Sequence, residues 1–199
     1  MFDPADIVVL KDCRRRCDCR ASLLRATKDL AKLIDSTWWQ IGGSKSRRDK
    51  EGDHSWRWAD IYGECRRDPW AECLCVVTDD GAVQGAVNYH LDAKSLASPE
   101  HGAVFVHHIA TAPRNRPWLV DQPEYRGIGV ALLAAAVRHG YSLGLEGRTV
   151  VPSLPTEQTR QFYENRGFIR IDEDADGIID YELPPDVAQD WLRSLGYLE

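Results

Sequence analysis

The chain has 199 residues, of which 43% are hydrophobic, and a formal net charge of −6. This length and composition are typical of one compact domain with a sizeable core, and they exclude disordered and collagen-like chains. The longest apolar run, residues 130–137, is too short to span a bilayer, which takes about 20 residues. No apolar segment typical of a secretion signal follows the N-terminal charges, so we expect a cytoplasmic protein without membrane contact.

The first third of the chain predicts a short strand at residues 7–10 and then an amphipathic helix at residues 20–39. The helix is predicted because apolar residues recur at helical spacing from Leu23 to Trp38. Residues 44–71 are mostly polar, with three interleaved tryptophans. No regular element is predicted in this polar segment.

The middle of the chain predicts a β-hairpin followed by a further strand. Residues 72–78 and 82–91 are apolar runs joined by Asp79-Asp80-Gly81, a strong hairpin signal. Residues 104–112 are rich in β-branched and aromatic side chains, which favour a strand. The segment 114–125, with two prolines, is predicted to be a long loop.

Two closely spaced glycines, Gly127 and Gly129, lead directly into an apolar helical segment that begins at Val130. Glycine lets a backbone approach a ligand closely, and the first turn of a helix has N–H groups without partners that favour anions. Together these features predict a site for a phosphate or pyrophosphate. A Walker loop is excluded because Lys and Ser/Thr do not follow Gly129, and a dinucleotide fingerprint is excluded because the third glycine is missing.

The last third predicts alternating strands and helices. Residues 148–151 read as a strand, and residues 157–168 as a helix with a tyrosine, a glycine break and the start of the next strand. Strands at 168–172 and 177–183 follow, joined by an acidic turn, and a final helix begins at Pro184. The acidic turn lacks the ligand spacing of a calcium loop and is interpreted as a solvated hairpin turn.

The run from Arg126 to Ala131, Arg-Gly-Ile-Gly-Val-Ala, resembles the acyl-CoA pyrophosphate loop of the GNAT N-acetyltransferase superfamily, whose pattern is Gln/Arg-x-x-Gly-x-Gly/Ala. Residues 162–168, Phe-Tyr-Glu-Asn-Arg-Gly-Phe, resemble the second signature of that superfamily. The order of strand, glycine loop, helix, strand, tyrosine helix and strand is also the order of this superfamily. The resemblance covers residues 72–183.

The resemblance implies an α/β (α+β) fold with a central mixed, mostly antiparallel sheet flanked by helices. It implies that residues 1–199 form a single acyl-CoA-dependent N-acetyltransferase domain. Within that domain, residues 11–71 would be the variable acceptor-side region, and residues 184–199 would form a C-terminal helix. The insertion at 114–125 is longer than this superfamily normally has before its glycine turn.

The resemblance implies acetyl-CoA as co-substrate, with its pantetheine running along the central strand and its pyrophosphate on the glycine loop. Thr156 stands where the family often has an asparagine that contacts the cofactor, and its hydroxyl can still donate one hydrogen bond. The implied cofactor-binding residues are Ile109, Ala110, Thr111, Arg126, Gly127, Ile128, Gly129, Val130, Ala131 and Thr156.

Acetyl transfer to an amine needs a neutral amine and a proton for the departing thiolate. Tyr163 matches the family tyrosine near the thioester sulfur and is the implied general acid. His107 shares a strand face with Ile109, and some family members carry an acid–base histidine there, so it is the candidate base. The next residue, His108, is expected on the opposite face in a structural role. Glu124, His90 and a water relay are left as other candidates.

The acceptor is an amine whose identity the sequence leaves open. Residues 51–199 carry 13 basic and 24 acidic groups, which would attract a cationic amine, and Trp56 and Trp58 would supply aromatic faces for it. A cationic small molecule or a protein amine is therefore expected. Residues 11–50 carry 12 basic and 5 acidic groups, which leaves a toxin acting on aminoacyl-tRNA as an alternative.

Two further readings stay open, a non-catalytic acyl-CoA sensor and an interaction module that uses the basic segment on nucleic acid. A homodimer is also left open. The six cysteines lack the paired C-x-x-C spacing of common zinc modules, so we expect free thiols in a reducing compartment and no metal site.

Overall fold

A computed structural model describes residues 6–40 and 51–198 of the chain. The chain divides into two compact units. The N-terminal unit comprises Asp3–Asn88 together with His108–Leu133, and the C-terminal unit comprises Tyr89–His107 together with the residues from Ala134 onward.

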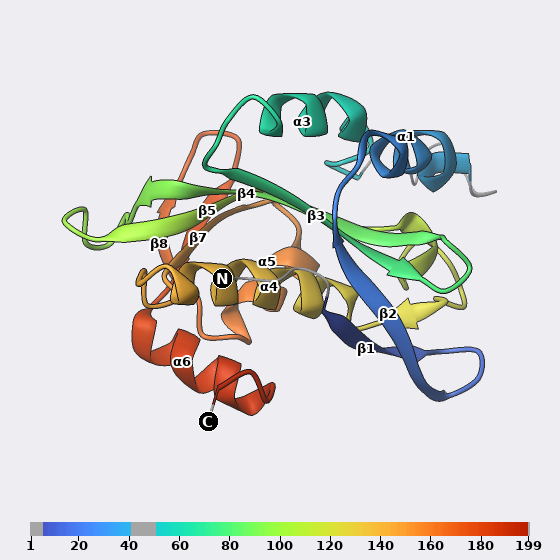
Figure 1. Cartoon of the computed structure of the whole chain (residues 1–199). Helices are drawn as coiled ribbons and strands as arrows, with labels where there is room; N and C mark the ends of the chain where they lie inside the picture. The colour runs from blue at the N-terminus through green and yellow to red at the C-terminus, as the bar shows by residue number, and fades with distance from the viewer. Residues whose placement is uncertain (1–5, 41–50, 199) are drawn as a thin grey trace. The chain divides into compact units, whose positions relative to one another are not determined.

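The N-terminal unit contains a sheet whose strands follow the order β6-β1-β2-β3-β4-β5. In Figure 1, α1 and α3 lie next to each other in this unit. The strands are β1 (Ile7–Asp12), β2 (Cys17–Arg25), β3 (Ala71–Thr78), the first half of β4 (Val83–Lys94), the end of β5 (Gly102–Thr111) and β6 (Tyr125–Arg126). The helical elements are α1 (Lys28–Thr37), η1 (Trp38–Gln40), α3 (Trp58–Cys65), η2 (Pro113–Asn115) and the first residues of α4 (Ile128–Ser142).

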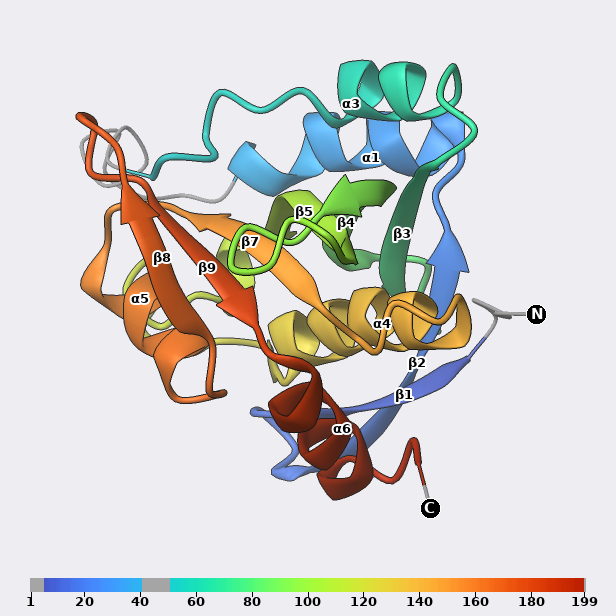
Figure 2. The ribbon, with the colours of Figure 1, turned by 90° about the vertical axis from the view of Figure 1, so that its left-hand side faces the viewer.

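The C-terminal unit contains the rest of β4, β5 and α4, and its strands follow the order β4-β5-β7-β9-β8. Figure 2 shows α5 beside the hairpin of β8 and β9. The remaining elements are β7 (Thr149–Ser153), α5 (Glu157–Glu164), β8 (Ile169–Glu173), β9 (Ile179–Leu183) and α6 (Pro185–Ser194).

The nine strands belong to one mixed sheet in which β5 and β7 pair in parallel, whereas β1–β2, β1–β6, β2–β3, β7–β9 and β8–β9 pair antiparallel. This arrangement confirms the predicted fold class. Among the described residues, no helix is both long enough and apolar enough to cross a membrane.

The prediction of a helix at residues 20–39 is wrong for its first part, which forms β2. Residues 21 and 23 are buried and their neighbours are more exposed, which is the two-residue period of a strand. Pairing with β1 on one side and β3 on the other holds this segment extended. The helix begins only at Lys28, after Thr27, whose side chain accepts a hydrogen bond from Leu30 N.

The helix α3 was not predicted, and its start is capped from outside its own sequence. Its N-cap residue, Arg57, makes no side-chain cap. Instead, the carboxylate of Asp35 in α1 accepts hydrogen bonds from the backbone N–H groups of Trp58 at 2.8 Å and Ala59 at 3.0 Å. A side chain of α1 therefore caps α3. Trp38, which follows α1, and Trp58 of α3 also meet edge to face in the apolar core.

The cysteines are all free, as predicted, and three of them lie in the core of the N-terminal unit. Burial raises the pKa of the Cys65 thiol to about 11 and that of Cys75 to about 12. These thiols are protonated at neutral pH and behave as small apolar side chains. In the described part of the chain, no group of three or more metal-ligating side chains comes together.

The segment 114–125, predicted as a loop, is held by a buried arginine. The Arg116 guanidinium contacts Glu51 at 2.6 Å and Asp53 at 2.8 Å, and it also donates to the Thr111 carbonyl at 2.7 and 3.0 Å. The side chains of Arg116 and Asp53 are only 6% and 5% exposed. Removing one partner of such a pair leaves an uncompensated buried charge.

Arg116→Met should therefore lower the free energy of unfolding by about 3–5 kcal/mol, because two carboxylates lose their counter-charge. Urea denaturation measures this loss. Arg170→Met is the matched control, since Arg170 forms an exposed pair with Glu173, and exposed pairs contribute about 1 kcal/mol or less. Equal losses in the two variants would contradict the structural role of Arg116.

Candidate functional site

The glycine loop forms the start of α4 in the way that the sequence predicts. Gly127 has a φ of +93°, which lies in the left-handed region that favours glycine. The helical hydrogen bond from Ala131 N to Gly127 O is 2.9 Å long. The N–H groups of Ile128, Gly129 and Val130 precede this bond and have no acceptor within the helix. These three groups, and not the N–H of Ala131, are the donors that the loop can offer to an anion.

The first turn of α4 packs directly on β4 because β4 has a glycine at the contact. A Cβ at Gly85 would lie 2.4 Å from Cγ2 of Ile128 and 2.9 Å from Cδ1 of Leu132. Any larger residue at Gly85 would push the helix start away from the strand. The position of this first helical turn therefore depends on the close approach at Gly85.

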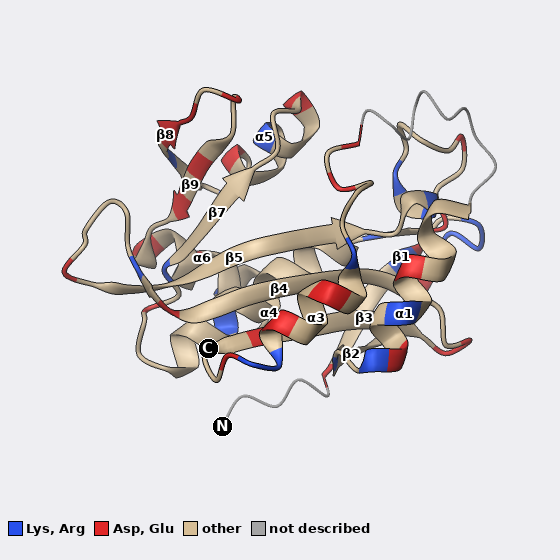
Figure 3. Ribbon diagram, turned by 90° about the horizontal axis from the view of Figure 1, so that it is seen from above, with Lys and Arg blue, Asp and Glu red and all other residues tan. Residues whose placement is uncertain are grey.

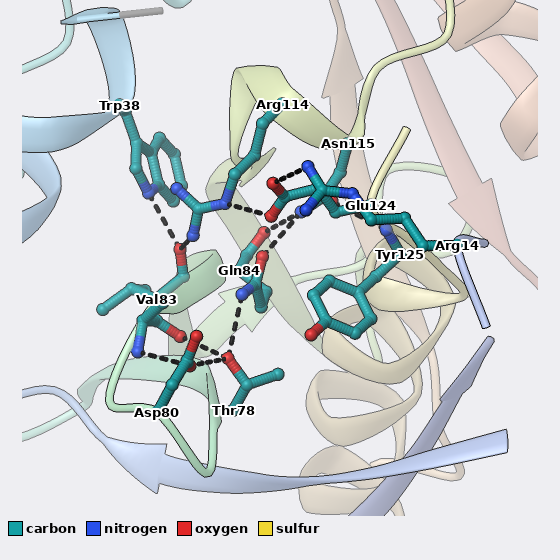
Figure 4. Close-up of polar contacts among 11 residues, drawn as sticks. Arg14, Trp38, Thr78, Asp80, Val83, Gln84, Arg114, Asn115, Glu124 and Tyr125 are labelled. Atoms are coloured by element: carbon teal, nitrogen blue, oxygen red, sulfur yellow. Dashed lines mark hydrogen bonds and ion pairs between the residues drawn. The ribbon is translucent and has the colours of Figure 1, made fainter. Parts of the chain in front are cut away.

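A chain of buried amides holds the entry to the glycine loop (Figure 4). Asn115 accepts a hydrogen bond from Tyr125 N at 2.9 Å and donates to the Gln84 side chain at 2.9 Å. Gln84 in turn donates to the Thr78 hydroxyl at 2.9 Å. Strand pairing of Tyr125 and Arg126 with β1 completes the support. The loop thus starts from a fixed backbone position.

Glu124 lies between two arginines. Its carboxylate contacts Arg14 at 2.7 Å and Arg114 at 3.2 Å (Figure 4). Each of the two carboxylate oxygens therefore contacts one arginine, and Glu124 ties Arg14 and Arg114 to the loop support.

A cavity of about 390 Å³ adjoins this support. Four carboxylates and two guanidinium groups line it, so its net charge is unfavourable for a phosphate. The lining residues are Asp12, Arg14, Arg15, Cys19, Thr78, Asp79, Asp80, Glu124 and Tyr125.

The central strand β5 leaves its parallel partner early. The pairing with β7 joins Val104 to Thr149 and Phe105 to Val150, and the register does not extend to Ile109. The Thr111 carbonyl is engaged by Arg116, so it is not available to a ligand. Three residues are predicted to hold pantetheine. The backbone groups of two of them, Ile109 and Ala110, do not take part in the contact with Arg116.

The tryptophans predicted to contact the acceptor have different environments. Trp56 is half-buried and its ring meets the His108 ring at 4.7 Å, nearly perpendicular. Trp58 is only 3% exposed and packs in the apolar core behind it, 6.2 Å from Trp56. Trp56 is therefore partly accessible, and Trp58 packs behind it in the core.

The two consecutive histidines of β5 also differ. His107, in the C-terminal unit, is exposed, and its ring lies 4.7 Å from Phe105 and 6.3 Å from His90. His108, in the N-terminal unit, is half-buried and its Nδ1 lies 3.5 Å from the Asn88 side-chain oxygen. Sequence reasoning gave His108 a structural role and missed its place beside Trp56.

Tyr163 lies in the aromatic core of the C-terminal unit. Its ring contacts Phe162 at 5.2 Å, Phe168 at 5.4 Å and Tyr181 at 5.7 Å, and the residue is only 3% exposed. Burial raises the pKa of its phenol well above the usual range, although the nearby Arg166 opposes the shift. The phenol therefore holds its proton at neutral pH.

Thr156 caps the tyrosine helix. Its hydroxyl oxygen accepts a hydrogen bond from Thr159 N at 3.2 Å and lies 2.6 Å from the Thr159 hydroxyl. This is the ordinary role of threonine at a helix start. The Thr156 hydroxyl therefore has its hydrogen-bond partner within the protein itself.

The N-terminal unit thus contains the glycine loop, Ile109–Thr111 and the two tryptophans, and the C-terminal unit contains His107, Thr156 and Tyr163. Asn88 and Arg116 were not predicted from the sequence. The only signal for Asn88 is that it is a polar residue inside a buried strand. The only signal for Arg116 is that it is an arginine in a proline-containing segment.

No protein-family description and no curated protein matches the sequence. Several solved structures are similar in fold. The GNAT domain of S. lividans PAT matches with a TM-score of 0.60 at 14% identity, over 89% of this chain and 95% of that domain. FdhC, a nucleotide-linked sugar GNAT, matches with a TM-score of 0.58 at 14% identity, over 97% of this chain and 98% of that one.

A spermidine N-acetyltransferase SpeG chimera from Vibrio cholerae and hSSAT matches with a TM-score of 0.56 at 12% identity, over 86% of this chain and 98% of that one. Since the identities are low, these likenesses establish the fold. The chain has the fold of the GNAT acetyltransferases, as the resemblance in its glycine loop and tyrosine helix predicts.

Asn115→Leu should lower the free energy of unfolding by about 1–3 kcal/mol, because it leaves Tyr125 N and the Gln84 amide without their partner. Urea denaturation measures the change. Gln122→Leu, in the exposed part of the same segment, serves as the control and should change stability by about 0.5 kcal/mol or less. A stable Asn115→Leu variant would show that the amide chain does not support the loop.

Proposed function

We propose that the chain is an N-acetyltransferase that moves an acetyl group from acetyl-CoA directly to a primary amine. The observation that supports this most is the start of α4, where three N–H groups follow a positive-φ glycine on a GNAT fold. Acetyl-CoA brings the activated acyl group and a pyrophosphate that matches these donors. The whole chain, residues 1–199, acts as one catalytic domain in the cytoplasm.

The glycine loop binds the pyrophosphate through Ile128, Gly129 and Val130 N–H, and the exposed Arg126 adds a positive charge at the loop entry. Ala131 contributes small size at the first turn, where it is buried. Gly127 supplies the turn itself. Ile109 and Ala110 hold the pantetheine by backbone groups, in the manner of an added strand.

Tyr163 assists the leaving thiolate. A phenol with a raised pKa keeps its proton in the resting enzyme and donates a hydrogen bond as negative charge develops on sulfur. Complete transfer to a thiolate is uphill for such a phenol, because a thiol has a reference pKa of about 8.5. The role of Tyr163 is therefore to stabilise the developing charge by a hydrogen bond, while water supplies the proton that the departing thiolate takes up.

The amine must reach the thioester in its neutral form, which requires a proton acceptor on β5. His107 is the candidate from the sequence, and its exposure allows exchange of the proton with water. The acceptor class is a cationic small-molecule or protein amine, for which Trp56 supplies an aromatic face. Acidic groups gather along β8 and β9 (Figure 3), in line with a cationic acceptor.

The aminoacyl-tRNA alternative depends on the basic N-terminal segment, and several of its charges have acidic partners. Lys11 pairs with Asp18, Arg14 with Glu124 and Arg25 with Glu72. Paired charges attract a polyanion less strongly than free ones. This arrangement favours the small or protein amine over tRNA. A non-catalytic sensor would bind acetyl-CoA without turnover. The turnover assay described below for Tyr163→Phe distinguishes it from the enzyme.

Gly129→Glu should raise the dissociation constant of acetyl-CoA at least about 100-fold, which is about 2.7 kcal/mol, because a Cβ and a carboxylate enter the anion site. Calorimetry measures binding, and thermal unfolding with acetyl-CoA gives a second readout. Gly63→Glu is the control, since its added Cβ meets no atom within 4 Å. Unchanged affinity in a folded Gly129→Glu variant would overturn the cofactor assignment.

Tyr163→Phe should lower turnover by about 100-fold or more and leave the affinity for acetyl-CoA nearly unchanged, since only the hydrogen-bond donor is lost. Release of free CoA, followed with a thiol reagent, measures turnover with spermidine or polylysine as the amine. Tyr141→Phe, a half-buried tyrosine of α4, is the control and should keep full activity. Full activity in both variants would reduce Tyr163 to a core residue.

A further inference from the structure

The base of the segment 114–125 is closed by contacts between the residues at its two ends. Glu124 donates its backbone N–H to the Arg114 carbonyl at 3.2 Å, and the side chains of the two residues form an ion pair, also at 3.2 Å. The next residue on each side adds a contact, because Tyr125 N donates to the Asn115 side-chain oxygen at 2.9 Å. We call these four residues the neck. A loop closed at its base delivers the chain that follows it, here the glycine loop, to one place.

The neck is attached to the start of β4 at two consecutive residues (Figure 4). Arg114 donates through Nη2 to the Val83 carbonyl at 2.8 Å, and Asn115 donates to the Gln84 side chain at 2.9 Å. The Val83 carbonyl also accepts a hydrogen bond from Trp38 Nε1 at 3.1 Å, which fixes the carbonyl from the side of η1. Two neighbouring positions of one strand therefore hold the neck, and through it the residues that lead into the glycine loop.

The next residue of β4 determines where the helix after the glycine loop begins. A Cβ at Gly85 would lie 2.4 Å from Cγ2 of Ile128, so the first turn of α4 packs directly against the strand. Residues 83–85 thus contact the chain on both sides of Gly127, at the neck before it and at Ile128 after it. The directions of the N–H groups at the start of α4 depend on both attachments.

Arg114 joins β4 to Glu124 through one rigid group. Its Nη2 and Nε belong to the same planar guanidinium, and they contact the Val83 carbonyl and the Glu124 carboxylate respectively. A planar fork makes both contacts only in one orientation, whereas a lysine carries a single point charge on a flexible stem. The Arg114 side chain is 19% exposed, so water competes little for these contacts.

We infer that Arg114 is a positioning residue for the pyrophosphate: it holds the glycine loop against β4 so that the N–H groups at the start of α4 point at the phosphate next to the pantetheine. This inference rests on the proposed acetyl transfer from acetyl-CoA. Hydrogen bonds weaken steeply when the donor turns away from the acceptor, so a displaced glycine loop binds the phosphate less strongly. Arg114 acts through the backbone, because its own donors are directed to Val83 and Glu124.

Two cofactor fragments that differ by one phosphate isolate this effect. S-acetylpantetheine carries the thioester and the pantetheine arm, and S-acetyl-4′-phosphopantetheine carries in addition the phosphate that the glycine loop is proposed to bind. Ligand-observed NMR, which suits weak binding, measures the dissociation constant of each fragment. In the wild type the phosphate should tighten binding by about 30-fold, and Arg114→Met should lower this gain by about 10-fold.

The ratio of the two dissociation constants separates positioning from a loss of stability. A smaller fraction of folded protein weakens the apparent binding of both fragments alike and leaves the ratio unchanged. Arg25→Met is the matched control, since Arg25 of β2 forms an ion pair with Glu72 of β3 in the same unit, and this variant should keep the wild-type ratio. Arg114→Lys keeps the charge without the planar fork and should lower the ratio as Arg114→Met does.

The outcomes distinguish this inference from the function on which it rests. A wild-type chain that gains no affinity from the phosphate overturns the proposed cofactor site, and the inference with it. A wild-type chain that gains affinity, with the gain kept in Arg114→Met, overturns the inference alone. A gain lost in Arg114→Met and kept in Arg114→Lys also overturns it, because the charge and not the fork would then bind the phosphate. If Arg114→Met fails to fold, the ratios in Arg114→Lys and Glu124→Gln decide.

Discussion

The buried guanidinium of Arg116 is the contact on which the arrangement of the N-terminal unit depends. It joins residues 51–53 to a distant part of the sequence, the end of β5 and the segment that follows it before the glycine loop. A buried arginine is stable only with its charge and its donors satisfied, so these segments must meet at one geometry. The tryptophan that faces His108 follows directly after residues 51–53. The ion pairs of Arg116 therefore link the segment before Trp56 to the segment before the glycine loop.

In the described residues, ion pairs balance part of the charge that is uneven along the sequence. The basic N-terminal segment meets acidic partners from elsewhere in the same unit, among them Glu72 and Glu124. These ion pairs neutralise positive charges that would otherwise attract nucleic acid. The anion site proposed at the start of α4 consists instead of backbone N–H groups, which can hold a pyrophosphate without a cluster of lysines. Because backbone N–H groups and not side-chain charges would bind the pyrophosphate, an acidic protein can be proposed to bind a highly anionic cofactor.

The two histidines of β5 show how neighbours in the sequence acquire different surroundings in the fold. Strict alternation along a strand predicts that His107 and His108 have different surroundings, and it offers no means to tell which surroundings are catalytic. The difference arises from Asn88, Trp56 and the Glu72 carbonyl, none of which is adjacent in sequence. Tyr163 is a contrasting case, because its motif identifies the residue while the aromatic core determines its protonation.

The sequence by itself determined the features that depend on local chemistry. The turn at Gly81, the positive φ of Gly127, the apolar helix after it and the cap at Thr156 each follow from a few consecutive residues. Only the tertiary structure decided that Leu23 lies in a strand, because pairing with β1 and β3 outweighs a helical pattern of apolar residues. Only it placed α3, whose first turn is capped by Asp35 from another helix. Contacts between distant segments have no signal in any single window, so the support of the candidate site became visible only once the chain was folded.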